Sequence, residues 1–128
     1  MSIYTHVTLG TNDLEQAKKF YDAVLIPLGL ARMPEFNDTS VMYAKDNSFL
    51  AITKPRNGEP ATHANGGTIG LRAPSREAVD AFHAGALANG GSCEGAPGPR
   101  EMAGPNAYAA YIRDPLGNKL CAYVGMME

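Results

Sequence analysis

The sequence has few cysteines and no long hydrophobic run. Only two of its 128 residues are cysteines, Cys93 and Cys121, and they lack Cys-x-x-Cys spacing, so we expect reduced thiols. No apolar stretch approaches the roughly 18 residues that cross a bilayer, and residues 1–6 lack the basic and apolar regions of a signal peptide. We therefore expect a cytoplasmic protein with no membrane partner.

A strong net charge is also absent. The formal charge is −2, from 11 basic and 13 acidic residues, and like charges do not form blocks. Since nucleic acids are bound through basic surfaces, we expect no nucleic-acid partner. Apolar residues make up 45% and charged residues 19%, which is typical of a globular domain rather than a disordered chain. A small molecule is the expected partner.

The chain contains an internal repeat with a constant offset of 62 positions, so that residue 9, for example, corresponds to residue 71. At this offset five residues are identical: Leu9 and Leu71, Glu15 and Glu77, Phe20 and Phe82, Leu25 and Leu87, Gly29 and Gly91. We therefore predict a single domain over residues 1–128, built from two modules. Module one spans about 1–56, a linker about 55–66, and module two about 67–128.

The first module reads as a strand, a helix and three further strands. Residues 3–9 are rich in β-branched side chains, which predicts a strand. Apolar residues then recur at helical spacing over 14–28, and Asn12 with Glu15 matches an N-terminal capping box. The three strands are expected at 30–35, 40–45 and 48–54, with Asp46 and Asn47 forming a two-residue turn.

The second module repeats this plan. A strand is expected over 68–73, and a helix from Ser75 whose apolar face includes Val79, Phe82, Ala86 and Leu87. Residues 92–107 are rich in glycine and proline, which predicts a short edge strand followed by an irregular loop. Strands over 108–113 and 118–123 complete the module.

Two such βαβββ modules in tandem give an α+β fold. We expect a curved, mixed, eight-stranded sheet with two outer helices, and its concave face is the expected site. One module alone cannot cover that face. Either the two modules of one chain pack together or two chains exchange modules, so we expect a homodimer that is side by side or module-swapped.

Four motifs carry a family resemblance. They are His6-Val7-Thr8-Leu9, Asp13-Leu14-Glu15 with Phe20-Tyr21, Leu28-Gly29-Leu30, and the closing Tyr111-Ile112-Arg113-Asp114-Pro115-Leu116-Gly117-Asn118. Together they resemble the vicinal oxygen chelate superfamily of glyoxalases, bleomycin-resistance proteins and extradiol dioxygenases. The resemblance spans nearly the whole chain.

The resemblance also implies where a metal ion would lie. Family enzymes hold a divalent metal with one side chain from the first and one from the last strand of each module. In this sequence those positions read His6, Leu50, Thr68 and Cys121. Leucine cannot coordinate a metal, and threonine is a poor ligand for Zn, Ni or Fe, so we expect no metal site and no cofactor. A metal-dependent lactoylglutathione lyase-like lyase or isomerase, or a dioxygenase, stays the alternative.

Candidate ligand-binding residues come from the strands and loops expected around the concave face. Tyrosine combines an apolar ring with a hydroxyl, and arginine can clamp a carboxylate or phosphate. Each candidate also has a structural explanation, namely sheet propensity, a surface charge or, for the cysteine, core packing. The candidates are His6, Tyr43, Arg72, Arg100, Tyr108, Tyr111 and Cys121. The sequence thus favours small-molecule binding, assigns no catalytic residue, and leaves a non-catalytic interaction module open.

Overall fold

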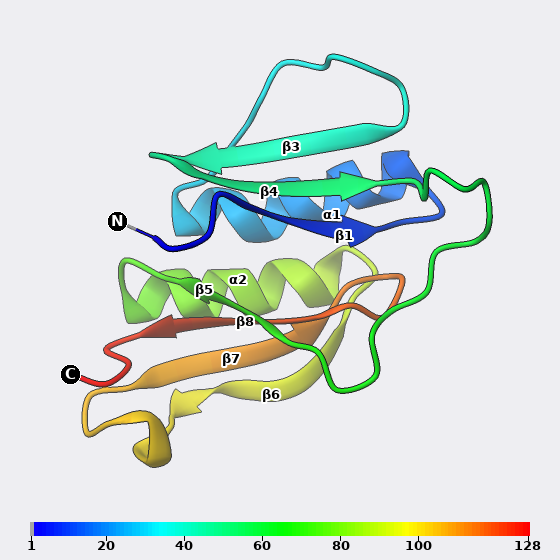
Figure 1. Cartoon of the computed structure of the whole chain (residues 1–128). Coiled ribbons are helices and arrows are strands. Elements are labelled where there is room, and N and C mark those ends of the chain that lie inside the picture. Colours follow the sequence, from blue (N-terminus) through cyan, green and yellow to red (C-terminus); the bar gives the residue numbers. More distant parts are fainter. Residues whose placement is uncertain (1) are drawn as a thin grey trace.

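A computed structural model, which describes residues 2–128, contains two βαβββ halves (Figure 1). The first half comprises β1 (His6–Gly10), α1 (Leu14–Leu25), the 3-10 helix η1 (Ile26–Leu28), β2 (Ala31–Arg32), β3 (Ser40–Lys45) and β4 (Ser48–Thr53). The second comprises β5 (Ile69–Arg72), α2 (Arg76–Ala88), β6 (Ser92–Pro99), the 3-10 helix η2 (Glu101–Ala103), β7 (Tyr108–Arg113) and β8 (Lys119–Val124). The predicted α+β class and tandem modules are confirmed.

The eight strands are divided between two mixed sheets of four strands each. The order is β1-β4-β3-β2 in the first sheet and β5-β8-β7-β6 in the second. In each sheet the module's first and last strands run parallel, and the other neighbours are antiparallel. The two halves meet where the Asn118 side chain donates a 3.1 Å hydrogen bond to the carbonyl of Gly10. Both helices lie behind the sheets in Figure 1.

One apolar core is shared by both halves. Phe20 on α1 and Phe82 on α2, which the repeat makes equivalent, are both fully buried. The two helices pack closely, because a Cβ atom added at Gly85 of α2 would lie 2.9 Å from the carbonyl oxygen of Ala23 on α1. Leu87 is 49% exposed, so its predicted place on the apolar face of α2 is wrong. Within residues 2–128, no helix has the length and hydropathy of a membrane span.

The start of α1 differs from the prediction. The carboxylate of Asp13, rather than the amide of Asn12, caps the helix by accepting a 3.0 Å hydrogen bond from the backbone N–H of Gln16. The Asn12 side chain instead bonds both backbone groups of Ala61, at 2.7 Å and 3.2 Å. Asn12 therefore ties the segment between the two sheets to the start of the helix.

The edge strands also differ from their predicted lengths. β2 covers two residues of the predicted 30–35, and Pro34 lacks the N–H that a continuing ladder would need. β6 lies at a sheet edge as predicted, but it is eight residues long. Its pairing with β7 shifts register around Gly95 and Gly98, so the strand accommodates glycine and proline through irregular pairing.

Candidate ligand-binding face

Each sheet has one face against the helices and one face that the helices leave open. On β1, Val7 and Leu9 pack against the core, so the alternating side chains of His6 and Thr8 point the other way. On β8 the core residues are Leu120 and Ala122, which places the residues at 119, 121 and 123 on the open side. We call these two surfaces together the open face.

The first sheet contributes a mainly neutral part of the open face. The sheet register pairs His6 with Phe49 and Thr8 with Ala51. His6 is exposed, and its Nδ1 lies 3.0 Å from the Thr5 hydroxyl oxygen. This sheet therefore offers one imidazole beside apolar side chains.

A tyrosine pair lies on the open side of the second sheet. The hydroxyl oxygens of Tyr111 and Tyr123 are 2.7 Å apart, and the rings meet edge to face with centroids 5.9 Å apart. Burial, and then the hydrogen bond with Tyr123, raises the pKa of the Tyr111 phenol. The Nζ atom of Lys119 lies 5.5 Å from the centroid of the Tyr111 ring. The predicted candidate Tyr111 thus lies within a half-buried aromatic and cationic cluster.

Arg100 directly follows β6, and its side chain reaches this cluster. Its guanidinium carbon lies 5.8 Å from the Tyr111 ring centroid, and its N–H groups donate to the carbonyls of Ala96 (2.7 Å), Gly98 (2.9 Å) and Pro99 (3.2 Å). A Cβ atom at Gly95 would lie 3.2 Å from the guanidinium and 3.3 Å from Cβ of Tyr111. Glycine at this position therefore permits the close approach of Arg100 to the tyrosine.

Cys121 lies beside Tyr111 on the neighbouring strand. It is 4% exposed, and burial raises the pKa of its thiol, while Tyr111 and the charges of Lys119 and Arg100 oppose this shift. The thiol consequently stays protonated at neutral pH. Cys121 therefore points toward the open face and is also buried, as expected for a cysteine that packs in the core.

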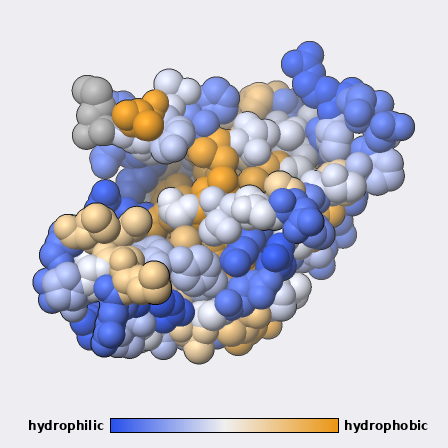
Figure 2. All heavy atoms as spheres, turned by 60° about the horizontal axis from the view of Figure 1, so that its bottom comes forward, coloured by the Kyte–Doolittle hydropathy of each residue, from blue (hydrophilic) through white to orange (hydrophobic). Residues whose placement is uncertain are grey.

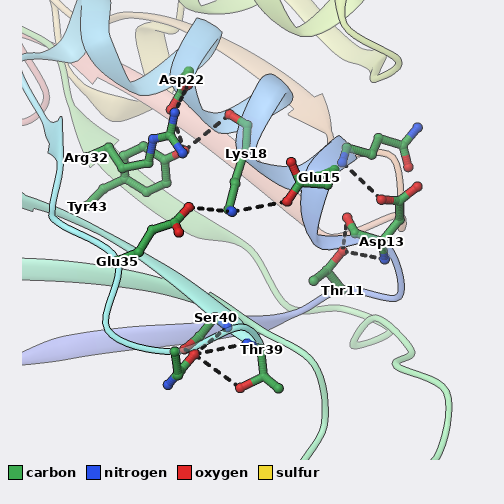
Figure 3. A network of polar contacts seen from close by, with 12 residues as sticks. Thr11, Asp13, Glu15, Lys18, Asp22, Arg32, Glu35, Thr39, Ser40 and Tyr43 are labelled. Carbon is green, nitrogen blue, oxygen red and sulfur yellow. Dashed lines mark hydrogen bonds and ion pairs between the residues drawn. The ribbon is translucent and has the colours of Figure 1, made fainter.

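Two predicted candidates, Tyr43 and Tyr108, point toward the helices instead. The Tyr43 hydroxyl donates to Asp22 on α1 at 2.7 Å, as Figure 3 shows, and the Tyr108 hydroxyl donates to Asp80 on α2 at 2.7 Å. Their expected position on the concave face is therefore corrected. Arg72, in contrast, is exposed on the open side of β5, where the sheet register pairs it with Tyr123.

The register also corrects one of the four metal positions. Thr8 pairs with Ala51 in the first sheet, and the repeat-related Gly70 pairs with Cys121 in the second. The counterpart of Cys121 is therefore Ala51, whereas Leu50 is buried in the core. Counting from the two hairpin turns gives the wrong residue because two residues separate β3 from β4 and five separate β7 from β8.

The resulting set does not fit a metal of the kind the family resemblance implies. His6, Ala51, Thr68 and Cys121 offer one imidazole and one buried thiol whose pKa is raised. A methyl group cannot coordinate, and three protein ligands are the usual minimum for a zinc site. Across residues 2–128, no three side chains of His, Cys, Asp or Glu gather as a metal site would require.

Two cavities lie away from the open face, around the N-terminus of α1. The larger, of about 650 Å³, is lined mainly by polar side chains, three of which pair with one another. Figure 3 shows Lys18 between Glu35 and Glu15, at 2.7 Å and 3.1 Å. The smaller, of about 190 Å³, borders Tyr21 and Asp114. Figure 2 shows a different hollow, between the two halves, with hydrophobic side chains inside it and a surface of mixed hydropathy around it.

Lys119 was missed from the sequence, whereas Tyr123 lies on an expected strand like the other candidate tyrosines. Both lie two positions from Cys121 on the same strand, so period-two alternation places all three on one face. This spacing was the signal that could have identified Lys119.

Comparisons with known proteins agree with the fold. A solved structure of a glyoxalase/bleomycin resistance protein from Albidiferax ferrireducens is 49% identical, with 95% of this chain and 98% of that chain covered and a TM-score of 0.86. A lactoylglutathione lyase from Agrobacterium tumefaciens is 23% identical, with 98% and 95% covered and a TM-score of 0.64. The fosfomycin resistance protein FosX from Mesorhizobium loti is 16% identical, with 99% and 95% covered and a TM-score of 0.70. The last two likenesses concern the fold alone.

The family follows from the sequence match. Among curated proteins, no sequence matches this chain. The sequence model of the Glyoxalase/Bleomycin resistance protein/Dioxygenase superfamily matches residues 3–122, which is nearly the whole chain. The chain therefore belongs to the glyoxalase/bleomycin resistance protein/dioxygenase superfamily.

Proposed function

We propose that this protein binds a small molecule on its open face without a resident metal ion. The supporting observation is the half-buried cluster of Tyr111, Tyr123 and Lys119 beside the position of Cys121. Small-molecule sites combine apolar and aromatic walls with a few polar groups that orient the ligand. The cluster supplies those polar groups, and Phe49 and Ala51 of the first sheet supply apolar contacts.

We further propose that two copies of the chain associate to cover this face. β1 and β5 each form one end of a four-stranded sheet, so within residues 2–128 one side of each strand lacks a strand partner. Exposed strand edges favour association with further strands, and Ile3 and Tyr4, just before β1, are largely exposed. Size-exclusion chromatography with light scattering tests this step, and a monomer at micromolar concentration contradicts it.

The absence of a resident metal is tested by elemental analysis and by thermal unfolding. We expect no stoichiometric metal and no rise in Tm when micromolar Zn, Ni, Mn or Fe(II) is added, because one imidazole and one neutral thiol do not complete a site. A rise in Tm that disappears in His6→Ala would overturn this expectation. It would instead favour a metal-dependent lyase and justify a lactoylglutathione assay.

Ligand binding is tested with the uncharged fluorescent probe N-phenyl-1-naphthylamine. We expect saturable binding to the folded protein and at least about tenfold weaker binding by Gly70→Leu. A leucine there would deny the probe roughly 60 Å² of apolar contact, which at about 25 cal/mol per Å² is worth about 1.5 kcal/mol. A Cβ atom at Gly70 would lie 3.5 Å from the Cys121 sulfur, which is ordinary contact, and Gly70 is exposed on the open side of β5, so a larger side chain there should extend over the cluster.

The matched control is Ala84→Leu on the exposed side of α2, which should leave probe binding unchanged. Equal binding by the wild type and Gly70→Leu would contradict a site on the open face. Absence of saturable binding by the wild type would contradict the proposed function itself.

A further inference from the structure

We propose that the ligand is an amphipathic anion, with its charged group on the second sheet beside Lys119 and Arg100 and its apolar part against the first sheet. This inference rests on the proposed function and names the class of molecule that the open face would bind. Carboxylates, sulfonates and phosphates share the required chemistry. The argument depends on how charge is distributed over the two sheets.

Positive charge is concentrated on the open side of the second sheet. Four cationic side chains lie there, and Glu94 is the carboxylate that contacts one of them. They are Arg72, Arg100, Arg113 and Lys119. The open side of β1 to β4 carries no Lys, Arg, Asp or Glu, while the whole chain has a net charge of −2. Composition therefore does not account for this local surplus, which favours an anionic ligand.

In the part of the chain that the structure describes, three of these charges form no ion-pair contact with a carboxylate, although Arg113 and, to a smaller extent, the charge of Lys119 lower the pKa of Glu94. Arg113 pairs with Glu94 and also donates to the carbonyl of Gly117 at 2.7 Å. Arg100 donates to backbone carbonyls, which carry no formal charge. Within residues 2–128, neither Lys119 nor Arg72 makes a side-chain hydrogen bond or ion pair. A bound anion would provide the missing negative charge.

The tyrosine pair leaves one hydroxyl proton available to a ligand. Tyr111 and Tyr123 have two O–H groups but share one hydrogen bond of 2.7 Å, so the accepting hydroxyl still has a proton, which a ligand can accept in competition with the Cys121 sulfur beside Tyr111. The raised pKa values of Tyr111 and Cys121 keep both groups uncharged at neutral pH. The cluster therefore adds a donor without adding negative charge.

The neighbouring part of the open face suits an apolar group. Met42, Phe49 and Ala51 share the open side of adjacent strands in the first sheet. Figure 2 shows hydrophobic side chains in the hollow between the two halves. A molecule with one charged end and one apolar end complements this arrangement better than a uniformly polar or uniformly apolar molecule.

The test compares two probes that differ chiefly in charge. The full-length protein is titrated with 8-anilinonaphthalene-1-sulfonate and, separately, with uncharged N-phenyl-1-naphthylamine. For Lys119→Gln we expect about fivefold weaker binding of the sulfonate, the size of one partly exposed ion pair. For Arg72→Gln combined with Lys119→Gln we expect about tenfold or more, while affinity for the uncharged probe changes less than about twofold.

Three controls separate the possible causes. Lys119→Arg should bind the sulfonate about as tightly as the wild type, because arginine keeps the positive charge. Lys19→Gln, at an exposed position on α1, should leave binding unchanged. Circular dichroism and thermal unfolding should give the same folded state for every variant, which is expected because Lys119 and Arg72 bond no other side chain within residues 2–128.

The outcomes distinguish this inference from the proposed function. Unchanged sulfonate affinity in the double variant, equal weakening of both probes, or an equal effect of Lys19→Gln would overturn the anion assignment while the uncharged probe still reports a site. If neither probe binds the wild type saturably, the proposed function fails, and the anion assignment fails with it.

Discussion

The hydroxyl of Tyr21 on α1 donates a 2.6 Å hydrogen bond to Oδ2 of Asp114, which follows β7 in the other half of the molecule. Both residues are buried. Oδ1 of Asp114 accepts hydrogen bonds from the backbone N–H groups of residues 116–118, at 2.8 to 3.0 Å. The Asn118 side chain bonds both Asp114 and the carbonyl of Gly10. The closing motif that resembles the family therefore joins the two halves.

Loss of the Tyr21 hydroxyl should destabilise the fold. We expect Tyr21→Phe to lower the free energy of unfolding by about 1–3 kcal/mol, because a buried carboxylate loses a hydrogen-bond donor. Urea unfolding measures the difference. Tyr4→Phe, at a side chain that is 65% exposed, should change it by less than about 0.5 kcal/mol. Equal effects of the two substitutions would contradict the role of the buried bond.

Alkaline pH should weaken the fold through the same residue. Burial, and then the charge of Asp114, raises the pKa of Tyr21 well above its ordinary value of 10.0. As pH rises past about 10, the unfolded chain loses the Tyr21 proton while the folded chain keeps it, so stability present below that pH is progressively lost. We expect Tyr21 to contribute a slope of about −1.4 kcal/mol per pH unit. Urea unfolding between about pH 9 and 11 should give a shallower slope for Tyr21→Phe, and parallel curves would exclude this linkage.

Elements with a strong local pattern could be predicted from the sequence. α2 begins after Ser75, whose hydroxyl caps it, and β7 spans Tyr108–Arg113, as predicted. Pro34 in the sequence already indicated a break within the predicted strand 30–35. The exact end of β2 could not be predicted, because a strand at a sheet edge continues only where its neighbour offers free backbone groups. Those groups belong to β3, where the partners of Arg32 and Ala31 are Tyr43 and Ala44, 11 and 13 positions further along the chain.

The candidate site was predictable only in part for a related reason. Alternation correctly places Tyr111 and Arg113 on one face of β7, with Ile112 on the other. The same alternation puts Tyr108 on the face of Ile112, opposite Tyr111, so these two tyrosines could not both face one ligand. Alternation does not reveal which face the helices cover, and Tyr43 was placed on the wrong side for that reason. That information depends on hydrogen bonds from Tyr43 and Tyr108 to residues on the two helices, which are distant in sequence from the tyrosines.

The corrected helix cap leads to a test by amide hydrogen exchange. Asp13→Ala should lower stability by about 1 kcal/mol and speed exchange at the N–H of Gln16, which would lose its acceptor. Asn12→Ala should leave Gln16 protected and speed exchange at the N–H of Ala61, which Asn12 accepts at 2.7 Å. Faster exchange at Gln16 in Asn12→Ala, with Gln16 still protected in Asp13→Ala, would mean that Asn12 caps the helix.

Close packing of the two helices should make Gly85→Ala destabilising. Alanine favours a helix over glycine by about 1 kcal/mol, so an open position would gain stability. At Gly85, however, the added Cβ would lie 2.9 Å from the Ala23 carbonyl oxygen, a backbone atom that moves only with α1. We expect a net loss of about 1–3 kcal/mol in the free energy of unfolding. Ala23→Gly should not rescue the variant, because the carbonyl remains. A stabilised Gly85→Ala protein would mean that the helices separate easily and that the two halves are not held together by this contact.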